Sequence, residues 1–134
     1  YKKIDLILSP AIGGIVVGYE IGRQMKIRTI FAERENGELI LRRGFNITPN
    51  SNVLVVEDVI TTGKSALECV ELLKKYNANL IGFACIIDRS DDKLLIKDKI
   101  TSQVKIEILT YKENELPEEI KNIEPIKPGS RNII

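Results

Sequence analysis

One stretch near the middle of the chain joins an apolar run to two carboxylates and a hydroxyl-rich loop. It extends from Val53 to Ser65 and reads VLVVEDVITTGKS. The β-branched run is typical of a buried strand, and the small residues after it are typical of a helix start. Backbone N–H groups of residues 61–65 would then favour an anion, which Gly63 would let approach the backbone closely. This stretch predicts a phosphate site.

The two carboxylates, Glu57 and Asp58, have the wrong charge to face a phosphate. We expect them to accept hydrogen bonds from neutral hydroxyls, such as those of a ribose, or to lie near a divalent cation. The hydroxyls of Thr61, Thr62 and Ser65 would add donors on the phosphate side. The pattern therefore favours a ligand that carries both a phosphate and a sugar.

Two familiar nucleotide motifs do not fit this chain. A Walker A loop that ends at residues 62–65 requires a glycine where Asp58 stands, so an ordinary ATPase is disfavoured. A dinucleotide fingerprint over residues 13–18 requires a middle glycine where Ile15 stands.

The acidic pair and the TTGKS loop resemble the phosphoribosyl pyrophosphate (PRPP) motif of the type I phosphoribosyltransferases. Five other pieces of the chain resemble the orotate phosphoribosyltransferases within that family. These pieces are SPAIGG at 9–14, FAER at 31–34, RRGF at 42–45, IDR at 87–89 and KPGSR at 127–131.

This resemblance implies a place for each part of PRPP. Glu57 and Asp58 would hold the ribose hydroxyls and, indirectly, Mg²⁺, which PRPP itself would mainly bind. The turn after the first strand would help to bind pyrophosphate. The lysine common there in the family is absent, so backbone amides or another chain would supply the missing positive charge. The implied PRPP-binding residues are Ala11, Ile12, Gly13, Gly14, Glu57, Asp58, Thr61, Thr62, Gly63, Lys64 and Ser65.

Residues 36–44 combine an Asn-Gly turn signal with a short strand pattern, which predicts a hairpin or a mobile flap. Relatives close a loop in this region over PRPP, often across a dimer interface, and commonly use lysines and a histidine. This chain contains no histidine. Arg34, Arg42 and Arg43 are therefore the candidates for catalytic contact with pyrophosphate, and a solvated basic flap is the alternative.

Arg89 follows another apolar strand pattern, and the matching arginine of the family contacts orotate. Thr61 is close enough in the loop to help by bonding a base carbonyl. The competing interpretation of Arg89 is an ordinary surface salt bridge.

The implied activity is Mg²⁺-dependent transfer of ribose 5-phosphate from PRPP to orotate, which gives orotidine 5′-monophosphate and pyrophosphate in pyrimidine biosynthesis. Two alternatives stay open: a PRPP-binding regulatory domain without catalysis, and a purine or xanthine phosphoribosyltransferase. The resemblance also implies a homodimer. Because a strand pattern begins almost at the first residue, we expect the family's N-terminal hood segment to be absent from this chain.

Strand and helix patterns alternate along the chain and must bring these residues to one place. They predict an α/β fold in which residues 1–134 form one phosphoribosyltransferase core domain, with a mainly parallel sheet flanked by helices, a flap hairpin and ligand loops at one sheet edge. The expected strands cover 4–8, 28–33, 53–56, 80–87 and 104–109. Helices are expected from residue 14, over 64–76 and within 115–121, with a charged connector over 91–99.

Side-chain patterns within these elements predict their packing. Gly14, Gly18 and Gly22 share one helical face, which indicates close approach to the sheet or to another subunit. Gly13 and Gly14 could adopt positive φ to direct N–H groups at an anion. The inner face of the 64–76 helix would contain Ala66, Cys69, Val70 and Leu73, and both Cys69 and Cys85 read as small core residues.

Composition argues against several classes of protein. The 20 Lys and Arg residues nearly balance 19 Asp and Glu, and a net charge of +1 gives no reason to expect nucleic acid as a partner. No apolar run reaches the roughly 18 residues of a membrane helix, and no secretory signal pattern follows the first residues. A cytoplasmic protein without membrane contact is the resulting expectation.

Overall fold

Strands and helices alternate along most of the chain. The computed structural model describes residues 3–109, 111, 113–124 and 126. The strands are β1 (Leu6–Pro10), β2 (Arg28–Glu35), β3 (Glu38–Leu41), β4 (Asn52–Ile60), β5 (Asn79–Asp88) and β6 (Ile100–Lys105). The helices are α1 (Gly13–Met25), α2 (Lys64–Lys75) and a short 3-10 turn, η1 (Glu113–Glu115).

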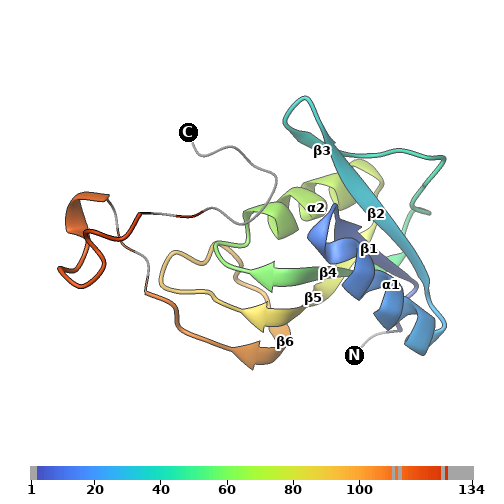
Figure 1. Cartoon of the computed structure of the whole chain (residues 1–134). Coiled ribbons are helices and arrows are strands. Elements are labelled where there is room, and N and C mark those ends of the chain that lie inside the picture. Colours follow the sequence, from blue (N-terminus) through green and yellow to red (C-terminus); the bar gives the residue numbers. More distant parts are fainter. Residues whose placement is uncertain (1–2, 110, 112, 125, 127–134) are drawn as a thin grey trace.

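The six strands form one sheet in the order β3-β2-β1-β4-β5-β6. β2 and β3 pair antiparallel around the Asn36-Gly37 turn, which confirms the predicted hairpin, and the other neighbours pair parallel. The carboxyl ends of the parallel strands therefore lie at the same edge (Figure 1). This is the mainly parallel α/β sheet that the sequence predicts.

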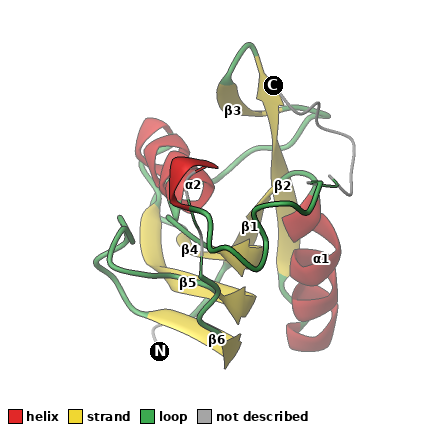
Figure 2. Cartoon of the chain, turned by 60° about the vertical axis from the view of Figure 1, so that its left-hand side comes forward, coloured by secondary structure: helices red, strands yellow, loops and turns green. Residues whose placement is uncertain are grey.

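The two helices cover opposite faces of the sheet (Figure 2). The larger core lies under α2, where Cys69 and Leu73 pack with Val55 and Phe83 of the sheet. The smaller core lies on the α1 face and is centred on buried Ile7, Leu54 and Val56. Because strand side chains alternate between faces, neighbouring residues of β4 belong to different cores.

Helix α1 packs on the sheet through its glycine face. Gly14, Gly18 and Gly22 are its buried residues. A Cβ atom at Gly18 would overlap Ser9 Oγ of β1, and one at Gly22 would overlap the Thr29 side chain of β2. Packing of this helix on the sheet, rather than on another subunit, therefore accounts for the glycine spacing.

Several element boundaries differ from the expected ones. β4 continues through Glu57 and Asp58 to Ile60, so the carboxylates lie inside the strand and not after it. β6 begins four residues before the expected start and ends at Lys105, which pairs with Asp88. Since β5 ends at Asp88, the apolar alternation of residues 106–109 has no strand beside it to pair with.

Two predictions about helices need correction. The helix expected within 115–121 is wrong: η1 and turns occupy this part of the chain, where the described side chains are exposed or half-buried and no core supports so short a helix. In α2, the fully buried set contains Leu72 in place of Val70, which is half-buried against the same core.

Other expectations hold. Cys69 and Cys85 are buried free thiols, and residues 91–99 form a connector without helix or strand. The KPGSR piece at 127–131 lies outside the described residues. None of the helices in the described parts of the chain is both long and apolar enough to cross a membrane.

Candidate active site

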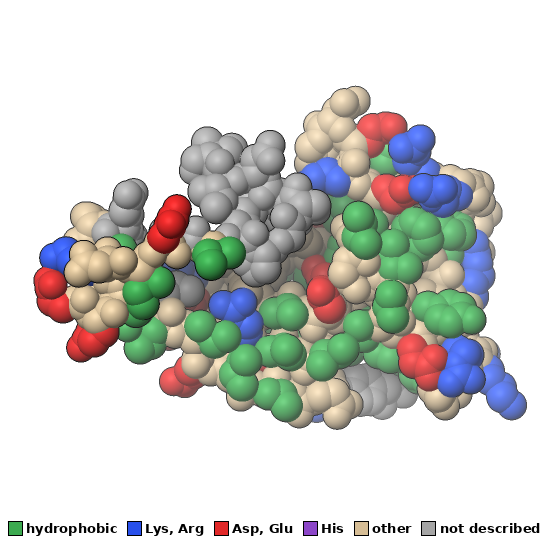
Figure 3. Space-filling view, viewed as in Figure 1, with side chains coloured by type: hydrophobic (Ala, Val, Ile, Leu, Met, Phe, Trp, Pro, Cys, Tyr) green, Lys and Arg blue, Asp and Glu red, His purple; other side chains and the backbone are tan. Residues whose placement is uncertain are grey.

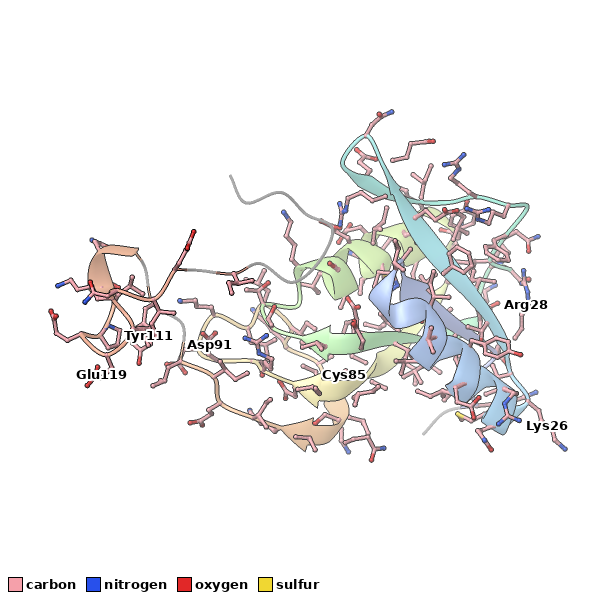
Figure 4. All side chains as sticks on the ribbon, viewed as in Figure 1. Lys26, Arg28, Cys85, Asp91, Tyr111 and Glu119 are labelled. Atoms are coloured by element: carbon pink, nitrogen blue, oxygen red, sulfur yellow. The ribbon has the colours of Figure 1, made fainter. Side chains whose placement is uncertain are left out.

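Three loops meet at the carboxyl edge of the sheet: the turn after β1, the loop after β4 and the segment after β5. The Arg89 N–H donates to the Ile60 carbonyl at 2.8 Å, and the Leu95 N–H donates to the Thr62 carbonyl at 2.9 Å. Figure 4 shows Asp91 of the third loop at this end, while Lys26 and Arg28 lie at the opposite end. The sheet thus gathers the predicted phosphate, pyrophosphate and base residues at one edge.

The loop after β4 has the geometry of a phosphate cradle. Gly63 precedes the first residue of α2 with φ of 78°, a left-handed conformation that favours glycine. The Lys64 N–H donates to Thr62 Oγ1 at 3.4 Å. The first turn of α2 has no acidic residue, so the N–H groups that follow and the helix dipole favour an anion in a small cavity of about 70 Å³. Glu57, Val59, Ile60 and residues 61–65 line that cavity.

The connector after β5 supports this loop, which the sequence analysis missed. Ile96 is buried, and its side chain lies against Gly63 at a place where a Cβ atom would approach within 2.6 Å. Leu94 also borders Gly63. The run Leu94-Leu95-Ile96 inside an otherwise charged segment was the available signal, because such a run needs a surface to cover.

The structure places the two acidic residues on opposite faces of β4. Glu57 is buried on the α2 side, where it borders the phosphate cavity. Asp58 projects to the α1 side, with its carboxylate against Gly13. Consecutive strand residues must diverge in this way, so the pair cannot act as one two-carboxylate group on a single face.

Burial changes the chemistry of Glu57. Loss of hydration, followed by repulsion from Asp58, raises the pKa of its carboxyl group to about 7. Near neutral pH this residue therefore exchanges a proton and can donate as well as accept a hydrogen bond.

The turn after β1 differs in detail from its expected form. The Ala11 N–H already donates to the Ala32 carbonyl at 2.8 Å, so this amide is not open to a ligand. The Ala11–Ile12 peptide is cis. Gly13 and Gly14 begin α1 without positive φ, so that expectation was wrong. The lack of a side chain at Gly14 instead allows close packing, because a Cβ there would come within 3.0 Å of the Val56 carbonyl oxygen.

Each of the three candidate arginines of the flap has a carboxylate partner. Arg34 bonds Glu68 of α2 and the Gly37 carbonyl of the hairpin turn. Arg43 makes two 2.8 Å hydrogen bonds to Glu33. Arg42 lies 3.4 Å from Glu35, which completes the set. All six side chains are partly exposed, so these are surface pairs that another anion can replace.

Arg89 lies at the end of β5 beside a cavity of about 380 Å³. Its Nε is buried without a hydrogen-bond partner in the described part of the chain, and no described carboxylate forms an ion pair with it. The described residues therefore do not form the surface salt bridge considered above. The cavity is also lined by Ser90, Asp91, Asp92, Lys93, Glu107, Ile108 and Leu109.

Known proteins share both the sequence and the fold. The model of the phosphoribosyl transferase domain matches residues 1–121. The orotate phosphoribosyltransferase of Parvibaculum lavamentivorans is 46% identical over 97% of this chain and 67% of its own length. The enzyme of the same name from Caldanaerobacter subterraneus is 46% identical over 98% of this chain and 69% of its own length.

The chain belongs to the orotate phosphoribosyltransferase family. Solved phosphoribosyltransferases share its fold at lower identity. Adenine phosphoribosyltransferase from Saccharomyces cerevisiae superimposes with a TM-score of 0.64 at 23% identity, over 76% of this chain and 67% of that one. Orotate phosphoribosyltransferase from Aeropyrum pernix gives 0.60 at 18% identity, over 78% and 62%. A type I phosphoribosyltransferase fold therefore carries the three loops.

Glu57 predicts a pH dependence of stability in this phosphoribosyltransferase. A carboxyl pKa raised to about 7 by folding means that the folded chain holds the proton more tightly than the unfolded chain. The resulting stabilisation is complete below about pH 4.5 and is lost as pH rises through about 7. Glu57→Gln should therefore stabilise the chain relative to the parent more at about pH 8 than at about pH 5. The change in the free energy of unfolding caused by the substitution should differ between these pH values by on the order of 3 kcal/mol.

Urea denaturation of both proteins at the two pH values measures this difference. Glu71→Gln is the matched control, because Glu71 is an exposed residue of α2 paired with Lys74. A Glu57→Gln effect equal at both pH values would show that the Glu57 carboxyl has an ordinary pKa.

Proposed function

We propose that this chain catalyses the Mg²⁺-dependent transfer of ribose 5-phosphate from PRPP to orotate in pyrimidine biosynthesis. The bond between C1 of the ribose and the pyrophosphate oxygen breaks, and C1 bonds to a ring nitrogen of orotate, which gives orotidine 5′-monophosphate and pyrophosphate. The observation that carries this proposal is the phosphate cradle at the start of α2, in a chain 46% identical to orotate phosphoribosyltransferases.

The cradle of residues 61–65 is proposed to hold the 5′-phosphate. The first N–H groups of α2, the Thr61 and Ser65 hydroxyls and the Lys64 ammonium all supply positive or hydrogen-donating character there. The small cavity suits a phosphate group and is too small for a base, which directs the base toward another part of the edge.

Asp58 suits contact with the ribose and with a cation. Its carboxylate is half-exposed and lies against Gly13, in the turn proposed to bind pyrophosphate. A pyrophosphate at this turn would be repelled by Asp58 unless a cation lay between them. Mg²⁺ is commonly bound by one or two carboxylates together with substrate phosphates, so this site fits it. Bound Mg²⁺ would neutralise charge on the leaving pyrophosphate.

The amides of residues 12–14 and the three flap arginines are proposed to bind the pyrophosphate. To bind pyrophosphate, each arginine would replace its ion pair with a carboxylate (Glu33, Glu35 or Glu68) by a contact with a phosphate oxygen. Such exchange is inexpensive at the surface, where the present ion pairs are weak. With charge building up on the leaving group as the C1–oxygen bond breaks, these contacts strengthen toward the transition state.

We further propose that residues 1–134 form one core domain that acts as a cytoplasmic homodimer. Ile12, Val16 and Tyr19 repeat at helical spacing on the outer side of α1, and their exposed fractions are 83%, 74% and 63%. Figure 3 shows hydrophobic side chains gathered over the face that carries α1. A second copy would cover this apolar row.

The first test of the function is PRPP binding. In calorimetry with Mg²⁺, the chain should bind PRPP, and Asp58→Asn should weaken binding by roughly tenfold, as expected when a charge-assisted hydrogen bond is lost. Asp5→Asn is the matched control, since Asp5 bonds the Asn52 N–H at the amino edge of the sheet. A folded chain that does not bind PRPP would overturn the proposal, and binding without turnover would favour a regulatory domain.

The second test concerns the base. Orotate differs from uracil by a carboxylate, which we propose that Arg89 binds. Arg89→Ala should lower kcat/KM for orotate. The corresponding loss of transition-state stabilisation should be on the order of 1–3 kcal/mol, with PRPP affinity little changed. Uracil binding by competition is the control and should not respond to the substitution. Preference of the parent chain for a purine or xanthine would remove orotate from the proposal but keep PRPP.

The third test concerns assembly. Sedimentation equilibrium should show a dimer, and Val16→Lys should shift it toward monomer because a charge then replaces an apolar contact. Lys74→Ala, on the exposed surface of α2, is the control. A parent chain that stays monomeric at high concentration would exclude the homodimer.

A further inference from the structure

Gly13 differs from the other glycines of α1 in what it touches. A Cβ atom at Gly13 would lie 2.7 Å from both Cγ and Oδ1 of Asp58, and would overlap Oδ2. The missing side chains of Gly14, Gly18 and Gly22 instead make room for the sheet backbone and for small side chains. Gly13 alone among the four therefore makes room for a charged side chain of the candidate site.

The conformation of Gly13 does not explain the glycine. Its φ is not positive, and as the first residue of α1 it has a backbone that any residue could adopt. Space for the Asp58 carboxylate is the remaining requirement at this position.

The Asp58 carboxylate lies against Gly13. No described residue donates a hydrogen bond to its carboxylate or forms an ion pair with it. Asp58 also lies at the start of α1, a helix without a side-chain cap or an acidic residue in its first turn, where the helix dipole favours a negative charge. The carboxylate thus lies against the first turn of α1 while its acceptor sites stay open.

We infer that Gly13 is a positioning residue for ribose recognition, which acts by seating the Asp58 carboxylate against the first turn of α1. This inference rests on the proposed PRPP site. It joins the turn that would bind pyrophosphate and the carboxylate that would bind the ribose into one packed unit. A methyl group at position 13 would displace the carboxylate yet leave the Gly13 N–H in place.

Ribose 5-phosphate is the probe that separates this role from a pyrophosphate contact, because it has the ribose hydroxyls and no pyrophosphate. Gly13→Ala should weaken binding of both PRPP with Mg²⁺ and ribose 5-phosphate by roughly tenfold. If the substitution weakens PRPP binding but leaves ribose 5-phosphate binding unchanged, Gly13 acts through pyrophosphate and the inference is wrong.

A double-mutant cycle tests whether the effect passes through Asp58. Asp58→Ala removes the carboxylate, so adding Gly13→Ala to that variant should cause no further loss of affinity. Gly18→Ala is the matched control, because it introduces the same methyl group into the same helix against Ser9, and its effect should add to that of Asp58→Ala. Additive effects of Gly13→Ala and Asp58→Ala would overturn the inference.

Folding and function failures can be told apart in this experiment. If Gly13→Ala alone does not fold, circular dichroism of the double variant decides: a folded double variant supports steric conflict with Asp58, and an unfolded one shows a need for Gly13 that is independent of Asp58. If the parent chain binds neither ligand, the proposed function fails, and a cycle in the free energy of unfolding still reports whether residues 13 and 58 are coupled.

Discussion

Parallel pairing of β4 between β1 and β5 is the interaction on which the rest of the site depends. The register sets Leu8 beside Val55, and Glu57 beside Cys85. It sets Ile60 beside Asp88 at the ends of β4 and β5, and β1 ends at the same edge of the sheet. Apolar contacts on both faces hold this register, because a shift by one residue would move Val53 and Val55 out of the α2 core.

The alternation of β4 side chains between the two faces of the sheet divides the site into two halves. Glu57 lies on the face of the sheet that α2 covers and borders the phosphate cavity, where burial raises the pKa of its carboxyl group to about 7. Asp58 shares the face of α1, where the helix dipole and exposure to solvent suit a charge. The two helices that cover the sheet thus give two adjacent residues of the same chemical type different surroundings.

The sequence was sufficient to predict what local pattern and chemistry determine. The β-branched run predicted β4, and the Asn-Gly pair predicted the hairpin. The glycine spacing predicted close packing of one α1 face, with the sheet or another subunit as the two candidates. The sequence was insufficient where contacts between residues far apart in the chain determine the structure. The end of β6 depends on the last pairing residue of β5, and the support of Gly63 by Ile96 depends on a loop more than thirty positions away. The role of Gly13 likewise requires Asp58 to lie across from it.

The carboxylates around the flap arginines have a physical consequence for ligand binding. Arg34, Arg42 and Arg43 would repel one another and stay mobile if they were unpaired, whereas Glu68, Glu35 and Glu33 hold them near the carboxyl edge. Arg34 also connects the hairpin to α2, the helix whose first turn forms the phosphate cradle. A phosphate oxygen can replace a carboxylate oxygen on a guanidinium with little loss of interaction energy. The ion pairs therefore keep the arginines close to the site and still allow them to bind a phosphate. The hairpin and the helix that forms the cradle are thereby joined through one side chain.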